Sequence, residues 1–532
     1  MRYFVLWVLI AIWPIAGQAQ HYNTYGMPGL IDMPVASSAP DAELAFSVAT
    51  FASQSRGSAT FQLSDRMSVS LRYAQLKNLH DIDGRSYDQI FDRSFGLHYR
   101  LFDETTHRPA VAIGVNDFVG TGIYAGEYIV GTKALSPQIS GTIGLGWGRL
   151  ASHGGFPHPL GGALGDRPDV PIGEGGAVTT AALFHGDTAV FGGLTYQPHD
   201  DVTVILEYSS DGYRAENGSA FDHQSPWNLG LSYWPRPDLQ LSAQYLYGSE
   251  FGLSASYGYN PKSAPVLRPP SVQQAGPFDW QIKPYIVPSL FDPDAPLRAD
   301  FGLALTGEWR IAPGVTAAGD LRQHIAGNLH RITRESDSVL PHVRSDFAKY
   351  SREGDLDLNS LTLAWYEQPY PNVATRLTLG LLEEMYAGAS AEALWHPPGN
   401  AVALGVELNA LQQRGYESDF RLRNYQVLSG HGSFYWDAGG GYHVQVDAGR
   451  YLAKDWGGTL TLSRRFENGW SLGAFATLTD VSFAEFGEGS FDKGIMFTIP
   501  LGEAGALSQT IRPVTRDGGA RVHVDGRLYT ID

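Results

Sequence analysis

The strongest pattern in this sequence is an alternation of apolar and polar residues, sustained over segments of about ten residues and then broken by a turn. In one segment Met67, Val69, Leu71 and Tyr73 alternate with serines and an arginine, and the stretch 239–247 repeats the pattern with leucine, alanine and tyrosine against glutamine and serine. Successive side chains of a β-strand point to opposite faces, so each segment has one apolar and one polar face. Segments of roughly 9–11 residues with this pattern are typical of strands that cross a membrane in a barrel.

The alternating segments occupy two stretches of the chain, 41–260 and 300–502, and predict two β-rich halves. Residues 261–299 between them are crowded with proline, which cannot donate a hydrogen bond to a strand ladder, and predict a linker. Residues 20–40 contain prolines and glycines and predict a plug-like or rim segment, and 503–532 predict a C-terminal tail without a membrane strand.

The fold class that follows is all-β, as a transmembrane antiparallel β-barrel. Two tandem barrels of about a dozen strands each are favoured, because a proline-rich crossing would interrupt a single ladder. One large barrel is the alternative, and a secreted β-sandwich or propeller fits the same short strands less well.

The first residues of the chain have the character of a signal peptide. Met1-Arg2 is a short basic start, an apolar run follows to Ile15, and small residues precede a predicted cleavage after Ala19. No later apolar run is long enough for a membrane helix, and the chain has no cysteine to form a disulfide or carry a lipid. We therefore expect residues 1–19 to be removed and the mature chain to reside in a bacterial outer membrane.

Charge and aromatic content refine this picture. The formal charge of −17 argues against a nucleic-acid partner. The chain has 27 tyrosines and 12 tryptophans, residue types that favour the membrane–water interface. Five tryptophans are candidates either for an interfacial belt or for stacking on sugar rings: Trp147, Trp365, Trp395, Trp436 and Trp470.

Three arginines and one acid–base pair are the candidate lumen residues. Arg93, Arg100 and Arg149 lie near strands, and an arginine on the lipid face costs roughly 2–4 kcal/mol at the midplane, so they are predicted to face a lumen or a rim. Glu127 and Lys133 are an even number of residues apart and are predicted to share one strand face. The functional hypothesis is a polar lumen network that contacts a sugar polymer, and the alternative is structural pairing that fills a narrow barrel.

No residue pattern predicts a catalytic centre, a cofactor or a metal. The spacing of His153, His158 and His185 matches no zinc signature, and Glu383 and Glu384 are neighbours that point to opposite faces of a strand. We therefore predict a protein that is not an enzyme, with no cofactor and no metal site. A hydrolase whose catalytic groups gather from distant segments is left open.

The last predicted strand carries a candidate assembly signal. Asp492 is followed by Gly494 and then by the apolar residues Phe497 and Ile499. This spacing resembles the signal that the outer-membrane barrel assembly machinery reads, and it predicts that machinery as a partner.

Several longer motifs, in order along the chain, carry a family resemblance. They are Tyr25–Ile31, Asp117–Gly122, Gly144–Leu150, Gly449–Asp455 and Phe486–Gly494. The set resembles the YjbH / GfcD family of outer-membrane exopolysaccharide (capsule) biogenesis proteins, over about Tyr22 to Arg521.

The resemblance implies a non-enzymatic part in the export or surface assembly of an exopolysaccharide. The partners it implies are polysaccharide, outer-membrane lipid and small periplasmic or lipoprotein components of the same export system. It implies no catalytic residues. The alternatives are an outer-membrane hydrolase or lipid-modifying enzyme, and a structural or adhesion barrel.

Overall fold

The computed structural model describes most of the chain. The described residues are 20–82, 85–168, 180–266, 276–290, 297–333, 336, 338–353, 356–482, 485–486, 491–500, 506–512 and 517–529. The predicted signal peptide, 1–19, lies outside them. The chain divides into two compact units, Met1–Ala264 and Pro265–Asp532. Among the described residues, no helix is both long and apolar enough to span a membrane.

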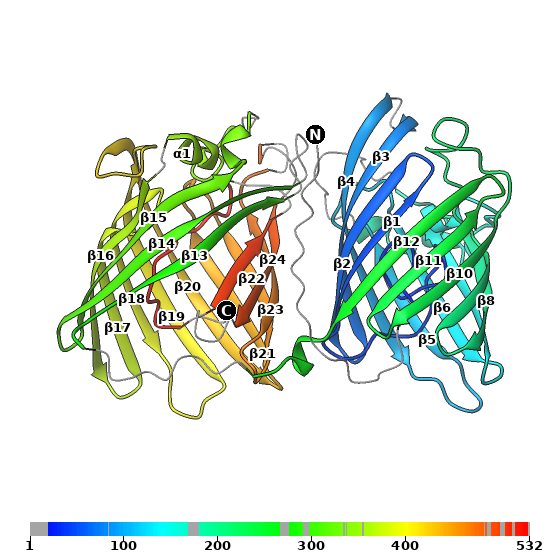
Figure 1. Ribbon diagram of the computed structural model, residues 1–532, viewed down its shortest axis with the longest axis horizontal. Coiled ribbons are helices and arrows are strands. Elements are labelled where there is room, and N and C mark those ends of the chain that lie inside the picture. Colours follow the sequence, from blue (N-terminus) through cyan, green and yellow to red (C-terminus); the bar gives the residue numbers. More distant parts are fainter. Residues whose placement is uncertain are drawn as a thin grey trace. The chain divides into compact units, whose positions relative to one another are not determined.

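The first unit is a closed barrel of antiparallel strands (Figure 1). Each strand pairs with its sequence neighbour, and β1 also pairs with β12, so the ladder has no free edge. The strands are β1 (Leu44–Phe51), β2 (Gln54–Ser64), β3 (Met67–Ile82), β4 (Arg85–Phe102), β5 (Ala110–Asn116), β6 (Gly126–Ala134), β7 (Ile139–Gly148), β8 (Thr188–His199), β9 (Val202–Tyr208), β10 (Trp227–Arg236), β11 (Leu239–Leu246) and β12 (Glu250–Tyr259).

The alternation in the sequence becomes an inside-out distribution of polarity. On β11 the apolar residues Leu241 and Tyr245 are exposed, whereas Gln240, Ser242 and Gln244 are buried. A soluble β-protein would bury the leucine and expose the glutamines. Apolar side chains therefore form the outer surface of this barrel, and polar side chains fill its interior.

The interior of the first barrel is filled by the segment before β1. Residues 22–36 are all buried, and Leu30 and Ile31 belong to one core cluster with Tyr128 and Phe191 of the barrel wall. Glu207 on β9 accepts hydrogen bonds from the backbone N–H groups of Ile31, Asp32 and Met33, at 2.8–3.2 Å. The proline-containing segment cannot supply a strand, and here it packs across the barrel as a plug.

The second unit is a 13-stranded antiparallel sheet that curls into a nearly closed barrel. Its two end strands, β13 and β25, meet where Gln509 Nε2 donates to the Ile286 carbonyl oxygen at 3.3 Å. The strands are β13 (Phe278–Leu290), β14 (Leu297–Ala312), β15 (Val315–Gly327), β16 (Leu356–Tyr370), β17 (Val373–Leu381), β18 (Tyr386–Trp395), β19 (Val402–Arg414), β20 (Leu422–Gly439), β21 (Tyr442–Arg450), β22 (Trp456–Arg465), β23 (Ser471–Thr479), β24 (Asp492–Pro500) and β25 (Ala506–Ile511).

Short helical turns occupy the connections. The first unit contains η1 (Arg149–Ala151), η2 (Gly162–Leu164), η3 (Thr180–Ala182) and η4 (Pro261–Ser263). The second contains η5 (Leu329–Arg331) and the single described α-helix, α1 (Phe347–Glu353). The prediction of two tandem barrels is confirmed, and the single large barrel is excluded because β1 closes on β12.

Two strands lie where the sequence predicted none. β13 falls inside the predicted linker 261–299, and it tolerates Pro284 and Pro288 because it is an end strand of the sheet order. These prolines are an even number of residues apart, so their missing N–H groups share one side of the strand and need no ladder partner there. β25 falls inside the predicted tail 503–532, and its six residues are too short and too weakly alternating to stand out in the sequence.

Candidate functional site

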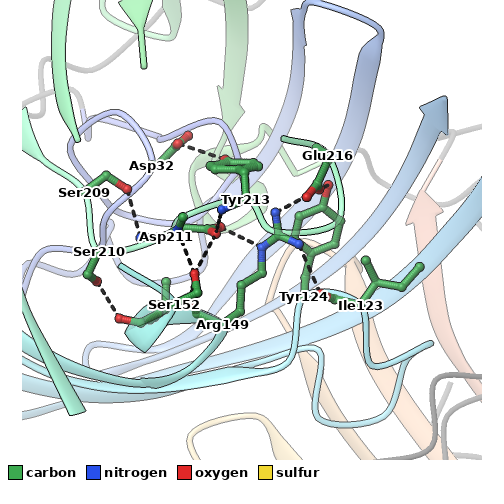
Figure 2. A network of polar contacts seen from close by, with 12 residues as sticks. Asp32, Ile123, Tyr124, Arg149, Ser152, Ser209, Ser210, Asp211, Tyr213 and Glu216 are labelled. Atoms are coloured by element: carbon green, nitrogen blue, oxygen red, sulfur yellow. Dashed lines mark hydrogen bonds and ion pairs between the residues drawn. The ribbon is translucent and has the colours of Figure 1, made fainter. Parts of the chain in front are cut away.

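Arg149 is the centre of a buried polar network in the first barrel (Figure 2). It lies on η1, and its Nε is 2.6 Å from Asp211 Oδ2 while its Nη2 is 2.8 Å from Glu216 Oε1. Its Nη1 donates to the Ile123 carbonyl oxygen at 3.2 Å. The two carboxylates come from the connection between β9 and β10, so one guanidinium joins three loops at the same end of the barrel.

The electrostatics of this network keep Arg149 charged. Burial lowers the pKa of Arg149, but the charges of Asp211 and Glu216 outweigh burial, so that the pKa rises well above its ordinary value. Burial also raises the pKa of Tyr124, to about 12, which keeps this phenol neutral beside the guanidinium. The Arg149 guanidinium carbon lies 4.2 Å from the Tyr124 ring centre and 4.6 Å from that of Tyr213.

The network continues into the plug. Tyr213 donates its hydroxyl to Asp32 Oδ2 at 2.9 Å, and the Tyr247 hydroxyl donates to the same oxygen. The Thr24 hydroxyl donates to the other oxygen of Asp32 at 2.5 Å and accepts from Arg56 on β2 at 2.8 Å. The plug, the wall and the loops are thus joined by buried polar contacts.

Glu127 and Lys133 share a strand face, as their spacing predicts, but this face is the outer one. Ile129 between them is exposed, whereas Tyr128 and Val130 are buried in the interior core. The predicted lumen network between Glu127 and Lys133 is therefore wrong, because strand parity fixes a shared face without deciding which face is inside.

Each of these two residues pairs with a different loop. Glu127 lies at the start of β6 and binds Arg167 through both carboxylate oxygens, at 2.7 and 3.0 Å, so that the long connection between β7 and β8 covers it. Lys133 lies near the other end of β6, 3.1 Å from Glu104.

Arg100 lies near the last residue of β4, and Arg93 lies in the middle of this strand. Arg100 Nε is 3.1 Å from Asp103 Oδ1, and Arg100 donates to the Asp65 carbonyl oxygen, at the β4–β5 turn. Arg93 is paired with Tyr73 of β3 and precedes Gly96, the first residue of β4 that pairs with β5. Arg93 therefore lies past the edge of β5. Both positions are at a rim, and only Arg149 of the three arginines belongs to the interior network.

A second set of interior contacts was missed by the sequence predictions. The segment 517–529, red in Figure 1, runs inside the second barrel. Arg521 Nη1 is 2.8 Å from Asp447 Oδ2, and Arg527 Nε is 2.9 Å from Glu407 Oε2. The sequence does offer one hint of these contacts, because the tail carries two arginines and the polar faces of the predicted strands carry carboxylates. The sequence does not indicate which strands the tail contacts.

The predicted tryptophans divide into two groups. Trp365, Trp395 and Trp436 are exposed on the outer face, near the ends of β16, β18 and β20, which lie at the same end of the antiparallel sheet. Trp147 and Trp470 are buried. The first group has the position of an interfacial belt, and the second group is part of the packing.

The histidines of the long β7–β8 connection form local contacts. Leu160 N–H donates to His158 Nδ1 at 3.1 Å, and the His153 ring lies 5.8 Å from the His223 ring. In the part of the chain that the structure describes, no three histidine, aspartate or glutamate side chains are grouped to hold a metal ion.

The candidate assembly signal lies on β24, which is not the last strand because β25 pairs with it. Asp492 is buried and lies 3.2 Å from Arg512, and Gly494 leaves room for the Phe475 ring. Phe497 and Ile499 are on the other face of the strand, by parity. The premise that this motif ends the barrel is wrong, and its reading by the assembly machinery stays a prediction.

The fold and the interior contacts define a class: a tandem β-barrel protein with apolar outer walls and interiors occupied by segments of its own chain. The family model described as exopolysaccharide biosynthesis protein matches residues 21–275 and 263–531. The chain belongs to this family, the YjbH family, and the resemblance noted from its motifs is confirmed.

Individual relatives extend this comparison. The chain is 25% identical to the uncharacterized lipoprotein YjbH of Escherichia coli K12, over 95% of this chain and 94% of that protein. The FrpB iron transporter of Neisseria meningitidis is matched over 95% of this chain and 85% of that one, with 8% identity and a TM-score of 0.22. The ferric-catecholate import receptor Fiu of E. coli K12 is matched over 88% and 76%, with 8% identity and a TM-score of 0.20.

Proposed function

We propose that this protein is an outer-membrane double barrel that takes part, without enzymatic activity, in the export or surface assembly of an exopolysaccharide or capsule. Membership of the exopolysaccharide biosynthesis family supports a part in making or exporting an exopolysaccharide. The proposed partners are outer-membrane lipid, the polysaccharide, the barrel assembly machinery and small periplasmic or lipoprotein components of the same system.

The observation that carries the proposal is the polarity of the barrel walls. Leu229, Leu231 and Leu253 of the first unit, and Val406 and Leu408 of the second, are more than half exposed. Exposed apolar bands of this kind are stable in lipid and mark an interaction or aggregation surface in water. Tryptophans at one end of the second sheet fit the interface expected at the edge of such a band.

The filled interior of the first barrel favours a role in assembly over free passage of polymer through that barrel. A polysaccharide chain would have to displace residues 22–36, which are buried and hydrogen-bonded to the wall. Arg149, Asp211 and Glu216 close one end by ion pairs. We therefore expect the first barrel to act as a rigid body in the membrane that presents its loops to polymer or partners.

Deletion and complementation of the gene test the proposal. The strain without the protein should have less polymer at the cell surface while intracellular sugar precursors persist, and the protein should fractionate with outer membranes and resist salt extraction. Normal surface polymer in the deletion strain would contradict the process. Recovery of the mature protein in the soluble periplasm after washing would contradict the membrane location.

A further inference from the structure

On its β13–β15 side, the second barrel has inward side chains that are more exposed than those of the first barrel. Arg322 and His324 point inward from β15, by their pairing with Ala304 and Gly302 of β14, and their side chains are 31% and 24% exposed. The inward residues Gln240 and Gln244 of the first barrel are buried. Exposure on the inner face of this nearly closed wall means contact with water inside the barrel.

The C-terminal segment 517–529 forms the opposite side of this space. Arg521 and Arg527 anchor it to Asp447 and Glu407 on the inner faces of β21 and β19. Between these anchors the side chains of His523 and Asp525 are 75% and 63% exposed. The segment therefore packs against one side of the barrel and presents its free side to the interior.

The turn end of this space is also open to water. Glu308 and Arg310, on the inner face of β14, have side chains that are 54% exposed each and lie 3.6 Å apart. On the other side of the C-terminal segment, between it and β18–β21, a separate polar cavity of about 70 Å³ is lined by Glu392, Gln445 and Tyr529 among others. A cavity of this volume and polarity holds several water molecules.

We propose that the second barrel contains a water-filled passage between the inner faces of β13–β15 and the segment 517–529, and that it admits hydrated ions and small sugars while the first barrel is closed. The proposal rests on the membrane location proposed above. Lysine, arginine and carboxylate side chains all line the passage, and Arg322 pairs with Asp320 at 2.9 Å. Because these charges are mixed and partly paired, the passage discriminates weakly between cations and anions.

The absence of native cysteine allows a sharp test with single cysteines and a charged, membrane-impermeant thiol reagent. Lys283 lies on the inner face of β13, opposite Ala304, and Ile282 beside it lies on the outer face. Full-length Lys283→Cys protein, reconstituted in a planar bilayer, should conduct and show a stepwise loss of conductance when the reagent is added. Ile282→Cys and Gln244→Cys proteins should conduct with no change, since the first side chain faces outward and the second is buried inside the first barrel.

A second variant tests the segment itself. Arg521→Gln combined with Arg527→Gln removes the two ion-pair anchors, while backbone contacts such as Gly519 N–H to Asp455 remain. The double variant should raise the single-channel conductance, because the segment is then held less firmly and narrows the passage less. Gel mobility before and after heating checks that each variant is folded.

The outcomes separate this inference from the proposed function. Folded protein that restores surface polymer but does not conduct would overturn the passage alone. Conductance that the reagent leaves unchanged at Lys283→Cys would also overturn it. Protein that fractionates as soluble would overturn the membrane location first.

Discussion

At the scale of single residues, the charges inside the first barrel are structural partners. Arg149 has all three of its nitrogen groups within hydrogen-bonding distance of an acceptor. Asp211 and Glu216 are fully buried, so neither carboxylate can turn to water if the guanidinium is lost. Removing one partner of a buried ion pair is strongly destabilising, since the remaining charge is left without compensation.

We expect Arg149→Gln to lower the stability of the folded barrel by roughly 3–5 kcal/mol. The measurement is a urea titration of refolded protein, followed by gel mobility, alongside the surface polymer of the same strain. Arg100→Gln is the matched control: Arg100 and Asp103 are both partly exposed, and the expected cost is about 0–1 kcal/mol. If the Arg149→Gln strain contains a normal amount of folded protein but less surface polymer, the arginine has a role in transport instead.

His21 gives the plug a pH dependence. Burial lowers the pKa of His21 to about 4, while its hydrogen bond to the Gly29 carbonyl oxygen opposes this shift, and Ser232 Oγ lies 2.8 Å from its Nε2. The unfolded chain takes up a proton near pH 6.5 and the folded chain only near pH 4. The stabilisation is therefore complete above about pH 6.5 and declines as the pH falls toward 4.

Between pH 7.5 and pH 5 we expect the free energy of unfolding to fall by about 2 kcal/mol more in the unsubstituted protein than in the His21→Asn variant. Unfolding midpoints in urea at the two pH values provide the measurement. The variant shares every other titrating group, so it isolates the histidine. An identical pH response in the two proteins would show that His21 is not held neutral in the plug.

At the scale of elements, one strand shows why alternation is a membrane signal here. On β19 the outward residues Leu404, Val406 and Leu408 are exposed, and the inward residues Glu407 and Asn409 are buried. This exposed apolar face is favourable in lipid and unfavourable in water. A charged substitution at its centre therefore distinguishes the two environments.

Leu408 lies near the middle of β19, and we expect Leu408→Arg to reduce the folding free energy in lipid vesicles by roughly 2–4 kcal/mol. Ala401→Arg, in the turn before β19, should leave the folding free energy nearly unchanged. Folding free energies from urea titrations in vesicles check both. If Leu408→Arg is also neutral, then this face is in water and the outer-membrane proposal fails.

At the scale of the whole molecule, the chain is two folding units with different modes of closure. The first sheet closes by pairing of β1 with β12, and its plug comes from its own N-terminal segment. Nothing in the described ladder of the first unit requires a strand from the second. The second sheet closes less completely, with β13 and β25 as its ends.

Residues 20–264 should therefore fold alone in detergent micelles, with β-sheet circular dichroism and a heat-dependent gel mobility. A closed ladder leaves no unpaired backbone groups in the apolar phase. The full-length protein in the same detergent is the control. A fragment that aggregates while the full-length protein folds would mean that the first unit needs the second.

The alternation of apolar and polar residues by itself determined the fold class, most of the strands and the division into two barrels, because side-chain period and strand length are local properties. The long motifs were sufficient to assign the chain to its family.

The sequence could not decide which face of a strand is inside, so Glu127 and Lys133 were correctly placed on one face and wrongly placed in a lumen. It also could not show that Arg149 meets Asp211 and Glu216, or that Arg521 meets Asp447, because these pairs join segments more than sixty residues apart. Only closure of each barrel brings such segments together, and burial within the closed wall then makes their pairing obligatory.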